Sequence, residues 1–234
     1  MGDEAVKTPV SDQADGLRRL MANSPGRLLA FVAGAPAADV GSVTLNLAAA
    51  LARQGQDVHL MDEHGEAPAR GGRRRGRLVL LHALLGAQGT LSPLAARADE
   101  LVVLLQPQAE AITAAYACIK RLRQAHGLKR VRVLVNQAAD AAEAQRIQAN
   151  LSGAAARYLG LALEPAGFIS ADAQLAEARR LNLSVVEAFP GSPATADFYR
   201  LASALLRWPL PPMAGEEAAE PHPPARRALH AAAA

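Results

Sequence analysis

The chain of 234 residues has few aromatic residues and almost no cysteine. Phe, Trp and Tyr make up 3% of it, so a core must be built from Leu, Val, Ile and Ala, which suit helices packed on a sheet. The single cysteine, Cys118, lies in an apolar helical pattern, which excludes a disulfide framework and a thiolate metal cluster. Residues 1–9 contain no apolar signal core, and no apolar run is long enough to span a bilayer. We therefore expect a cytoplasmic protein.

From residue 27 onward, apolar strands alternate with amphipathic helices. Half of the residues are hydrophobic, which is enough for the core of one α/β domain. The repeated order predicts a doubly wound, mostly parallel sheet flanked by helices, with right-handed crossovers. The expected strands are residues 28–33, 57–62, 78–83, 100–105, 130–135, 165–169 and 185–188, and the expected helices are residues 42–54, 93–98, 109–125, 141–159, 172–180 and 192–206.

Three parts are expected along the chain. Residues 1–26 form a tether with a short helix, residues 27–208 form the α/β domain, and residues 209–234, rich in Pro and Ala, form a disordered tail. A Gly- and Arg-rich loop over residues 63–76 interrupts the domain. We interpret its charge as solvated and expect no direct binding of nucleic acid, because no aromatic residue lies there to stack on bases; contact with nucleic acid, acidic lipid or an acidic protein is the alternative. The arginines concerned are Arg70, Arg73, Arg74, Arg75 and Arg77.

The loop after the first strand, residues 34–41, lies at the ligand-binding edge of a doubly wound sheet. Nucleotide-binding versions of this loop use backbone N–H groups, a Lys and a Ser or Thr that binds Mg²⁺. This loop has no Lys, Pro36 lacks an N–H, and Asp39 brings a negative charge to the phosphate position. Repulsion between two such anions costs several kcal/mol at an effective dielectric constant of about 20. We therefore do not expect tight binding of ATP.

The next residues resemble the helix and second strand of the MinD/ParA ATPases, a family with the P-loop NTPase fold. They read VTLNLAAALA over residues 43–52 and VHLMD over residues 58–62. Aligned through Asn46, the family motif GKGGVGKT falls on residues 34–41. Only Gly34 then matches; the phosphate-binding Lys is replaced by Val40 and the Thr by Gly41. The resemblance implies a parent family that uses ATP and Mg²⁺, and a degenerate Walker A motif here.

Among these proteins the sequence is closest to the FlhG group, also called FleN, which regulates flagellar number. That group begins with a DQAxxLR helix, and residues 12–18 read DQADGLR. The resemblance covers roughly residues 12–208. Further matching segments are ADE at 98–100, VN at 135–136, RYLG at 157–160, GFI at 167–169 and VVEAFP at 185–190.

Acidic residues of the parent family are replaced in this chain. The family's DAD after the second strand reads Asp62-Glu63-His64, and the Walker B Asp position holds His82. Because Mg²⁺ needs oxygen ligands, hydrolysis by the family mechanism is not expected, and neither ATP nor a metal is an expected cofactor. The two histidines lie at strand ends and could in principle ligate a metal with Asp62, but we interpret them as surface residues. The resemblance places Asn136 near the adenine; without a phosphate cradle, we expect it to bind local backbone groups.

The resemblance implies a regulator of flagellar number or placement that acts as a pseudo-ATPase. In the family the N-terminal helix contacts FlhF, a signal-recognition-type GTPase, and its Gln helps to complete the active site of that partner. We expect Gln13 to orient the attacking water. Flagellar C-ring proteins or a FleQ-type transcription activator are further implied partners. The expected contacts to the GTPase are Asp12, Gln13, Ala14, Leu17 and Arg18.

Two alternatives remain open. One is an active MinD-like ATPase with an unorthodox phosphate loop, which dimerises with ATP. The other is a MinD-like scaffold of a different cell-envelope assembly system. The family's C-terminal membrane helix falls after residue 208, where the sequence is poor in apolar residues, so we expect weak or no membrane binding. The resemblance also implies a polar position or one at the periphery of the inner membrane.

Overall fold

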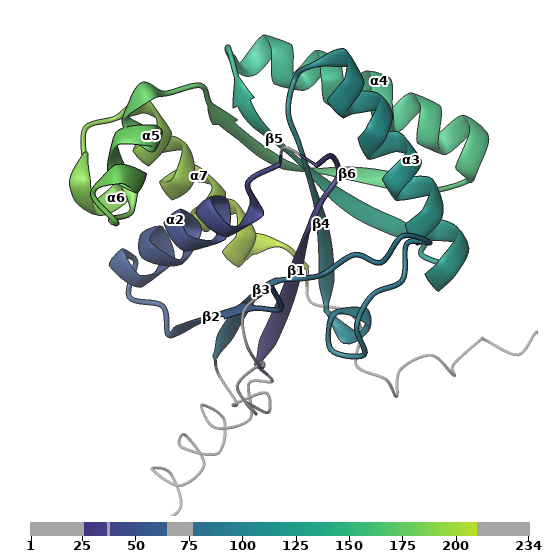
Figure 1. Ribbon diagram of the computed structural model, residues 1–234, viewed down its shortest axis with the longest axis horizontal. Helices are drawn as coiled ribbons and strands as arrows, with labels where there is room; N and C mark the ends of the chain where they lie inside the picture. The colour runs from purple at the N-terminus through teal and green to yellow at the C-terminus, as the bar shows by residue number, and fades with distance from the viewer. Residues whose placement is uncertain (1–25, 37, 65–76, 210–234) are drawn as a thin grey trace, which may run out of the picture.

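The computed structural model describes residues 26–36, 38–64 and 77–209. Within them six strands form one parallel sheet in the order β2-β3-β1-β4-β5-β6 (Figure 1). This confirms the predicted doubly wound fold. The strands are β1 (Arg27–Ala33), β2 (Val58–Asp62), β3 (Leu78–His82), β4 (Glu100–Leu105), β5 (Arg130–Ala138) and β6 (Ala162–Ser170). The helices are α2 (Val40–Arg53), η1 (Ala95–Arg97), α3 (Ala109–His126), α4 (Ala141–Leu159), α5 (Ala173–Arg180), α6 (Val185–Ala188) and α7 (Pro193–Arg207).

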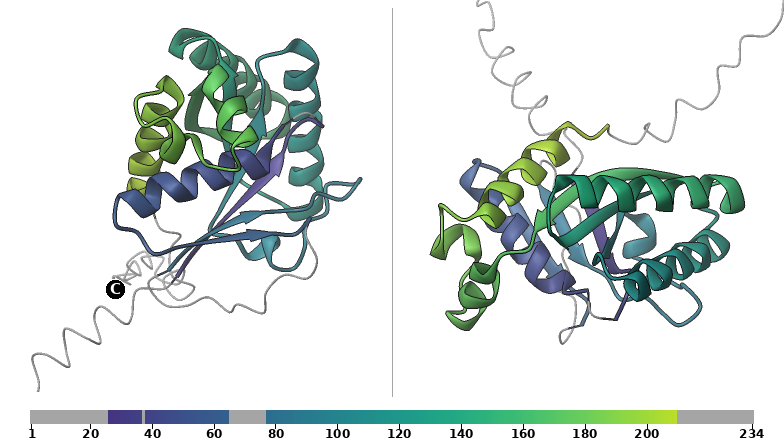
Figure 2. Two further views of the ribbon diagram at one scale, coloured as in Figure 1. Left: turned by 60° about the vertical axis from the view of Figure 1, so that its left-hand side comes forward. Right: turned by 90° about the horizontal axis from the view of Figure 1, so that it is seen from above.

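Helices cover both faces of the sheet and give the molecule two apolar layers (Figures 1 and 2). Helices α3 and α4 pack on one face, and α2, α6 and α7 pack on the other. Cys118 of α3 is a free thiol in the first layer, and burial raises its pKa to about 11. Trp208, directly after α7, is buried in the second layer. No helix in the described part of the chain is both long enough and apolar enough to cross a membrane.

One predicted strand is wrong. Residues 185–188 form the short helix α6, not a strand. Ser184 caps it: its side chain accepts the Glu187 N–H, and the Glu187 carboxylate in turn accepts the Ser184 N–H. This reciprocal capping box overrides the strand preference of two adjacent valines. The side-chain oxygen of Asn46 in α2 also accepts the Val185 N–H at 2.6 Å, which fixes α6 to α2.

The first strand begins beside the end of the last helix. The guanidinium of Arg27 donates to the carbonyl of Leu205 at 3.0 Å and to that of Pro209 at 3.5 Å. A further cation from β5, Arg132, stacks over the ring of Trp208 at 4.2 Å. The two limits of the described domain therefore meet at the amino edge of the sheet.

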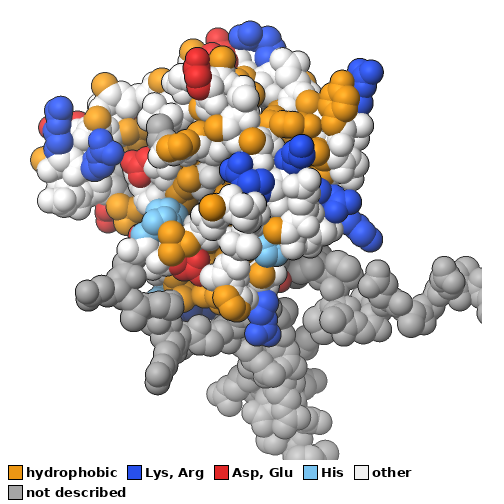
Figure 3. Space-filling view, turned by 45° about the vertical axis from the view of Figure 1, so that its right-hand side comes forward, with side chains coloured by type: hydrophobic (Ala, Val, Ile, Leu, Met, Phe, Trp, Pro, Cys, Tyr) orange, Lys and Arg blue, Asp and Glu red, His pale blue; other side chains and the backbone are white. Residues whose placement is uncertain are grey.

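Several sequence predictions fall outside the described residues. These are the helix at residues 12–18, most of the tail, and the arginine run except Arg77. Arg77 pairs with Asp57 at 3.1 Å. On the face seen in Figure 3, Lys and Arg side chains are spread over the surface and do not gather in one patch.

Candidate functional site

The loop after β1 leads directly into α2, and a carboxylate of the chain itself occupies the start of that helix. Asp39 is the N-cap, and its Oδ1 accepts the Ser42 N–H at 3.0 Å. Its Oδ2 pairs with Arg179 of α5 at 3.1 Å. Free N–H groups and the helix dipole make a helix N-terminus an anion site, which a phosphate uses in nucleotide-binding loops. Here the anion is Asp39.

The residues around this loop do not fit Mg²⁺-ATP held in the manner of the parent family. Val40, at the position of the phosphate-binding Lys, is 1% exposed and belongs to the apolar layer under α2. Gly41, at the Thr position, has no hydroxyl. The Ser42 hydroxyl, one residue further on, accepts from the Asn46 side-chain amide at 3.4 Å, and the Thr44 hydroxyl donates to the carbonyls of Val40 and Gly41 and is 1% exposed as a residue. The first turn of α2 therefore carries no phosphate-neutralising amine and no hydroxyl at the position of the family's metal-binding Thr.

A hollow lies between α2, α5 and the end of β5, where the resemblance places the adenine. Asn136 is buried at its floor, next to a bulge in which Gln137 has a φ of 62°. The hollow measures about 210 Å³, below the roughly 300–1,000 Å³ usual for small-molecule sites. Its polar lining residues are Asp39, Ser42, Asn136, Gln137, Asp172 and Arg179.

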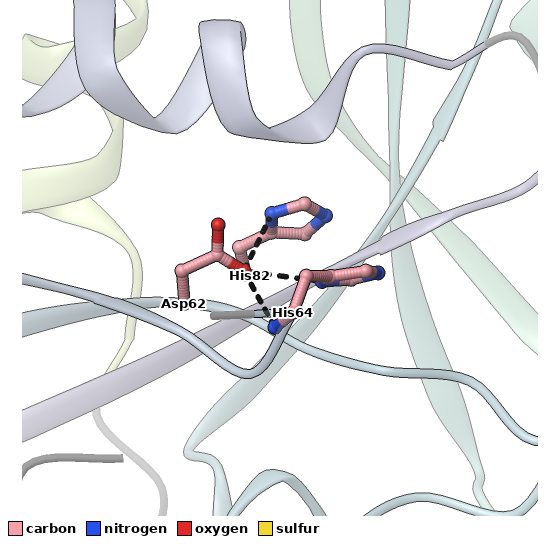
Figure 4. A group of neighbouring side chains, drawn as sticks. All are labelled: Asp62, His64 and His82. Carbon is pink, nitrogen blue, oxygen red and sulfur yellow. Dashed lines mark hydrogen bonds and ion pairs between the residues drawn. The ribbon is translucent and has the colours of Figure 1, made fainter. Parts of the chain in front are cut away.

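A second group of polar side chains lies at the ends of β2 and β3. Asp62 and His82 are the last residues of these strands and are paired in register. The Oδ1 atom of Asp62 is 3.1 Å from Nδ1 of His82 and 3.1 Å from Nδ1 of His64 (Figure 4). The two imidazoles stack with centroids 4.0 Å apart. The proximity that the strand ends suggested is therefore present.

The charges of this group depend on burial and on each other. Burial lowers the pKa of His82 below its ordinary value, and the nearby Asp62 carboxylate offsets this only in part. Burial by itself raises the pKa of Asp62, but the hydrogen bond from the His64 backbone N–H and the nearby imidazoles of His82 and His64 more than offset this, so the pKa lies below its ordinary value. At neutral pH the group therefore contains an ionised carboxylate beside a neutral His82.

Glu63 holds the two strand ends together. Its N–H donates to the carbonyl of His82 at 3.0 Å, and its carboxylate accepts the Leu84 N–H at 2.9 Å and the Ser92 hydroxyl. His82 ends β3, and Leu84 and Ser92 follow it in the chain. These bonds therefore fix the turn that carries His64 relative to His82.

The predicted nucleotide-site residues separate into two places. Gly41, Asp62 and His82 lie together: a Cβ at Gly41 would be 3.6 Å from Nδ1 of His82. Asn136 lies in the other hollow, on the Asp39 side of α2. The five predicted GTPase-contact residues are outside the described part of the chain.

Sequence reasoning missed two residues of this region, Arg179 and Glu63. The partner of Arg179 is 140 positions away, so no local pattern reveals the pair. Glu63 lies between Asp62 and His64 in the segment that aligns with the family's DAD motif. That position in the motif was the one sign in the sequence that Glu63 belongs to the site.

Comparisons with known proteins bear on the fold and on about half of the sequence. No family model matches the chain. The antiactivator FleN of Pseudomonas aeruginosa is 37% identical over 114 residues, which are 49% of this chain and 41% of FleN. About half of the chain is therefore similar in sequence to FleN. The chain thus matches less than half the length of this relative.

Solved MinD structures superpose on most of this chain. MinD in the MinC:MinD complex of Aquifex aeolicus has a TM-score of 0.59 and 16% identity, covering 80% of this chain and 98% of that one. MinD of Pyrococcus horikoshii with Mg-ADP has a TM-score of 0.58 and 13% identity, covering 78% and 96%. At these identities the structures support the fold, and together with FleN they confirm the resemblance found in the sequence.

Proposed function

We propose that the chain is a FlhG/FleN-like regulator of flagellar number or placement that acts by binding partners and does not turn over ATP. The observation that carries this proposal is the Asp39 carboxylate at the N-terminus of α2, where a nucleotide-binding loop holds phosphate. The buried Val40 beside it supplies no compensating charge. A site without Lys and Thr favours a role in binding over one in hydrolysis.

The proposed partners follow from the relatives. The FleN relative is an antiactivator, which supports a transcription activator as one partner. A MinD neighbour is in a complex with MinC, so this fold serves as a partner-binding scaffold there. We further propose that Asp12, Gln13, Ala14, Leu17 and Arg18 engage an FlhF-type GTPase, at the cell pole or the periphery of the inner membrane.

Calorimetry with Mg-ATP tests the loss of the nucleotide site. We expect no saturable heat at micromolar nucleotide, because the phosphate would meet the carboxylate of Asp39. Asp39→Asn is the matched variant, since Asn also caps helices well but removes the charge. An affinity that rises in this variant identifies the charge as the barrier, whereas micromolar binding by the unchanged protein favours the active ATPase.

A GTPase assay tests the partner role. We expect the full-length chain to accelerate GTP hydrolysis by an FlhF-type GTPase, and Gln13→Ala to reduce this stimulation about tenfold or more, because a Gln can position the attacking water. Gln56→Ala changes an exposed Gln of the folded domain and should leave stimulation intact. Absence of stimulation, or full stimulation by Gln13→Ala, contradicts the proposal.

A further inference from the structure

We propose a binding site for a divalent metal ion such as Zn²⁺ or Co²⁺, formed by Asp62, His64 and His82. One carboxylate oxygen and two imidazole nitrogens are ligands that Zn²⁺ and its neighbours in the periodic table prefer. The three ligand atoms all lie within 4.8 Å of one another. The site stands where the parent family has its acidic residues, but it differs in its ligand atoms, because Mg²⁺ prefers oxygen and two of the three ligands here are imidazole nitrogens.

The distances from Asp62 to the two histidines suit ligands of a tetrahedral ion. Two ligands bound to zinc at about 2.0–2.1 Å in a tetrahedron are roughly 3.3 Å apart. Asp62 Oδ1 lies 3.1 Å from each histidine Nδ1. The sheet itself produces this spacing, because Asp62 and His82 are paired at the ends of neighbouring parallel strands.

Hydrogen bonding leaves His82 available to a ligand. Its Nδ1 is buried and makes no hydrogen bond of good geometry, although the Asp62 oxygen is 3.1 Å away. Buried polar atoms normally have a partner, and an unfilled ion site is one explanation for an exception. The His64 side chain is 45% exposed, so its ring has room to turn and aim its nitrogen at a shared ion (Figure 4).

Hydrogen bonds hold the backbone of the turn at residues 62–64 in position before an ion binds. The His64 N–H donates to Asp62 Oδ1 at 2.9 Å, and the Glu63 carboxylate fixes the same turn to Leu84 and Ser92. Such outer contacts orient ligands and contribute to metal affinity. The fixed turn reduces the entropy lost when the ion binds.

Three protein ligands leave a fourth position open. The two histidines line a hollow together with the backbone of the loop after β1 and with Arg121 of α3. Gly41 adds no side chain beside His82. Zinc sites with three protein ligands keep the fourth position for water or a bound group. The ion is therefore accessible to a small ligand at the same edge of the sheet as the loop.

Metal titration of the full chain without an affinity tag tests the site. After removal of metals with a chelator, we expect one strong Zn²⁺ site by calorimetry near neutral pH, and visible absorption bands of low-symmetry Co²⁺ when cobalt is added. Mg²⁺ should not compete, because it prefers oxygen ligands. Thermal melting should shift upward with Zn²⁺ in the unchanged protein, because the ion binds the folded state.

Variants decide whether these three residues hold the ion. His64→Gln changes an exposed side chain, so the protein should remain folded. Its zinc affinity should fall by more than about 100-fold, because losing a residue that merely orients a metal ligand already costs up to about that much. Asp62→Asn should do the same. His59→Gln, on the same strand, is the matched control and should bind zinc normally. Absence of a zinc site in the unchanged chain, or binding that persists in the double variant His64→Gln/His82→Gln, overturns the proposal.

Discussion

Replacing Glu100 by Gln is expected to lower the free energy of unfolding by about 3–5 kcal/mol, because it removes the fully buried anion that the mostly buried Arg27 and Arg132 share. The Glu100 side chain is 2% exposed and pairs with Arg130 at 2.9 Å and with Arg132 at 3.1 Å. Arg27 lies 4.0 Å away, and burial already lowers the pKa of its guanidinium, an effect that Glu100 opposes. Chemical denaturation measures the loss.

Glu164→Gln is the matched control for this prediction. Glu164 also pairs with Arg132, at 2.7 Å, but its side chain is 37% exposed. Solvent-exposed pairs contribute about 0–1 kcal/mol, so the control should be close to the unchanged protein. Equal losses in the two variants would show that burial does not set the strength of this network.

Replacing Gly34 by Ala is expected to lower the free energy of unfolding by about 3 kcal/mol. This is the upper end of the usual cost of forcing extra atoms into a packed core. A Cβ at this position would lie 2.7 Å from the carbonyl oxygen of Leu104 and 2.9 Å from the Val103 side chain. The Gly34 N–H donates to the same carbonyl at 2.7 Å, so the two strands cannot move apart without losing that bond. Thermal and chemical unfolding both report the change.

Gly41→Ala tests whether the effect is specific to that contact. A Cβ at Gly41 meets only His82, at the ordinary distance of 3.6 Å, and Ala is favoured over Gly within helices by up to about 1 kcal/mol. We expect a neutral or stabilising effect, measured without added metal. The contrast explains why Gly34 is the one position of the phosphate loop that matches the family: close packing of strands requires it whether or not phosphate binds.

The sequence predicted the elements with strong local signals. The bounds of β4 and α4 agree with prediction, because a continuous apolar run and a long amphipathic period leave little choice. Helix α2 begins two residues earlier than predicted because Asp39 caps it. Residues 185–188 were misassigned because the apolar pair outweighed the Ser184 and Glu187 capping box, which was visible in the sequence.

The candidate site was predictable only in part. Strand ends in a parallel sheet meet at one edge, so the proximity of Asp62, His64 and His82 followed from the strand assignments. The distances and the unbonded Nδ1 of His82 depend on register and ring orientation, which sequence does not specify. From the residue types alone we interpreted the two histidines as surface residues. The distances and the unbonded nitrogen lead us to favour a metal site instead. The pairing of Asp39 with Arg179 depends on how α5 packs.

The bonds from Arg27 to Leu205 and Pro209 decide where the terminal segments leave the domain. Both segments attach at the amino edge of the sheet, whereas the Asp39 hollow and the histidine pair lie at the carboxyl edge. Strand β1 has seven residues, and seven residues span roughly 23 Å at about 3.3 Å each. The points where the chain enters and leaves the described domain therefore lie about one strand length from both candidate sites.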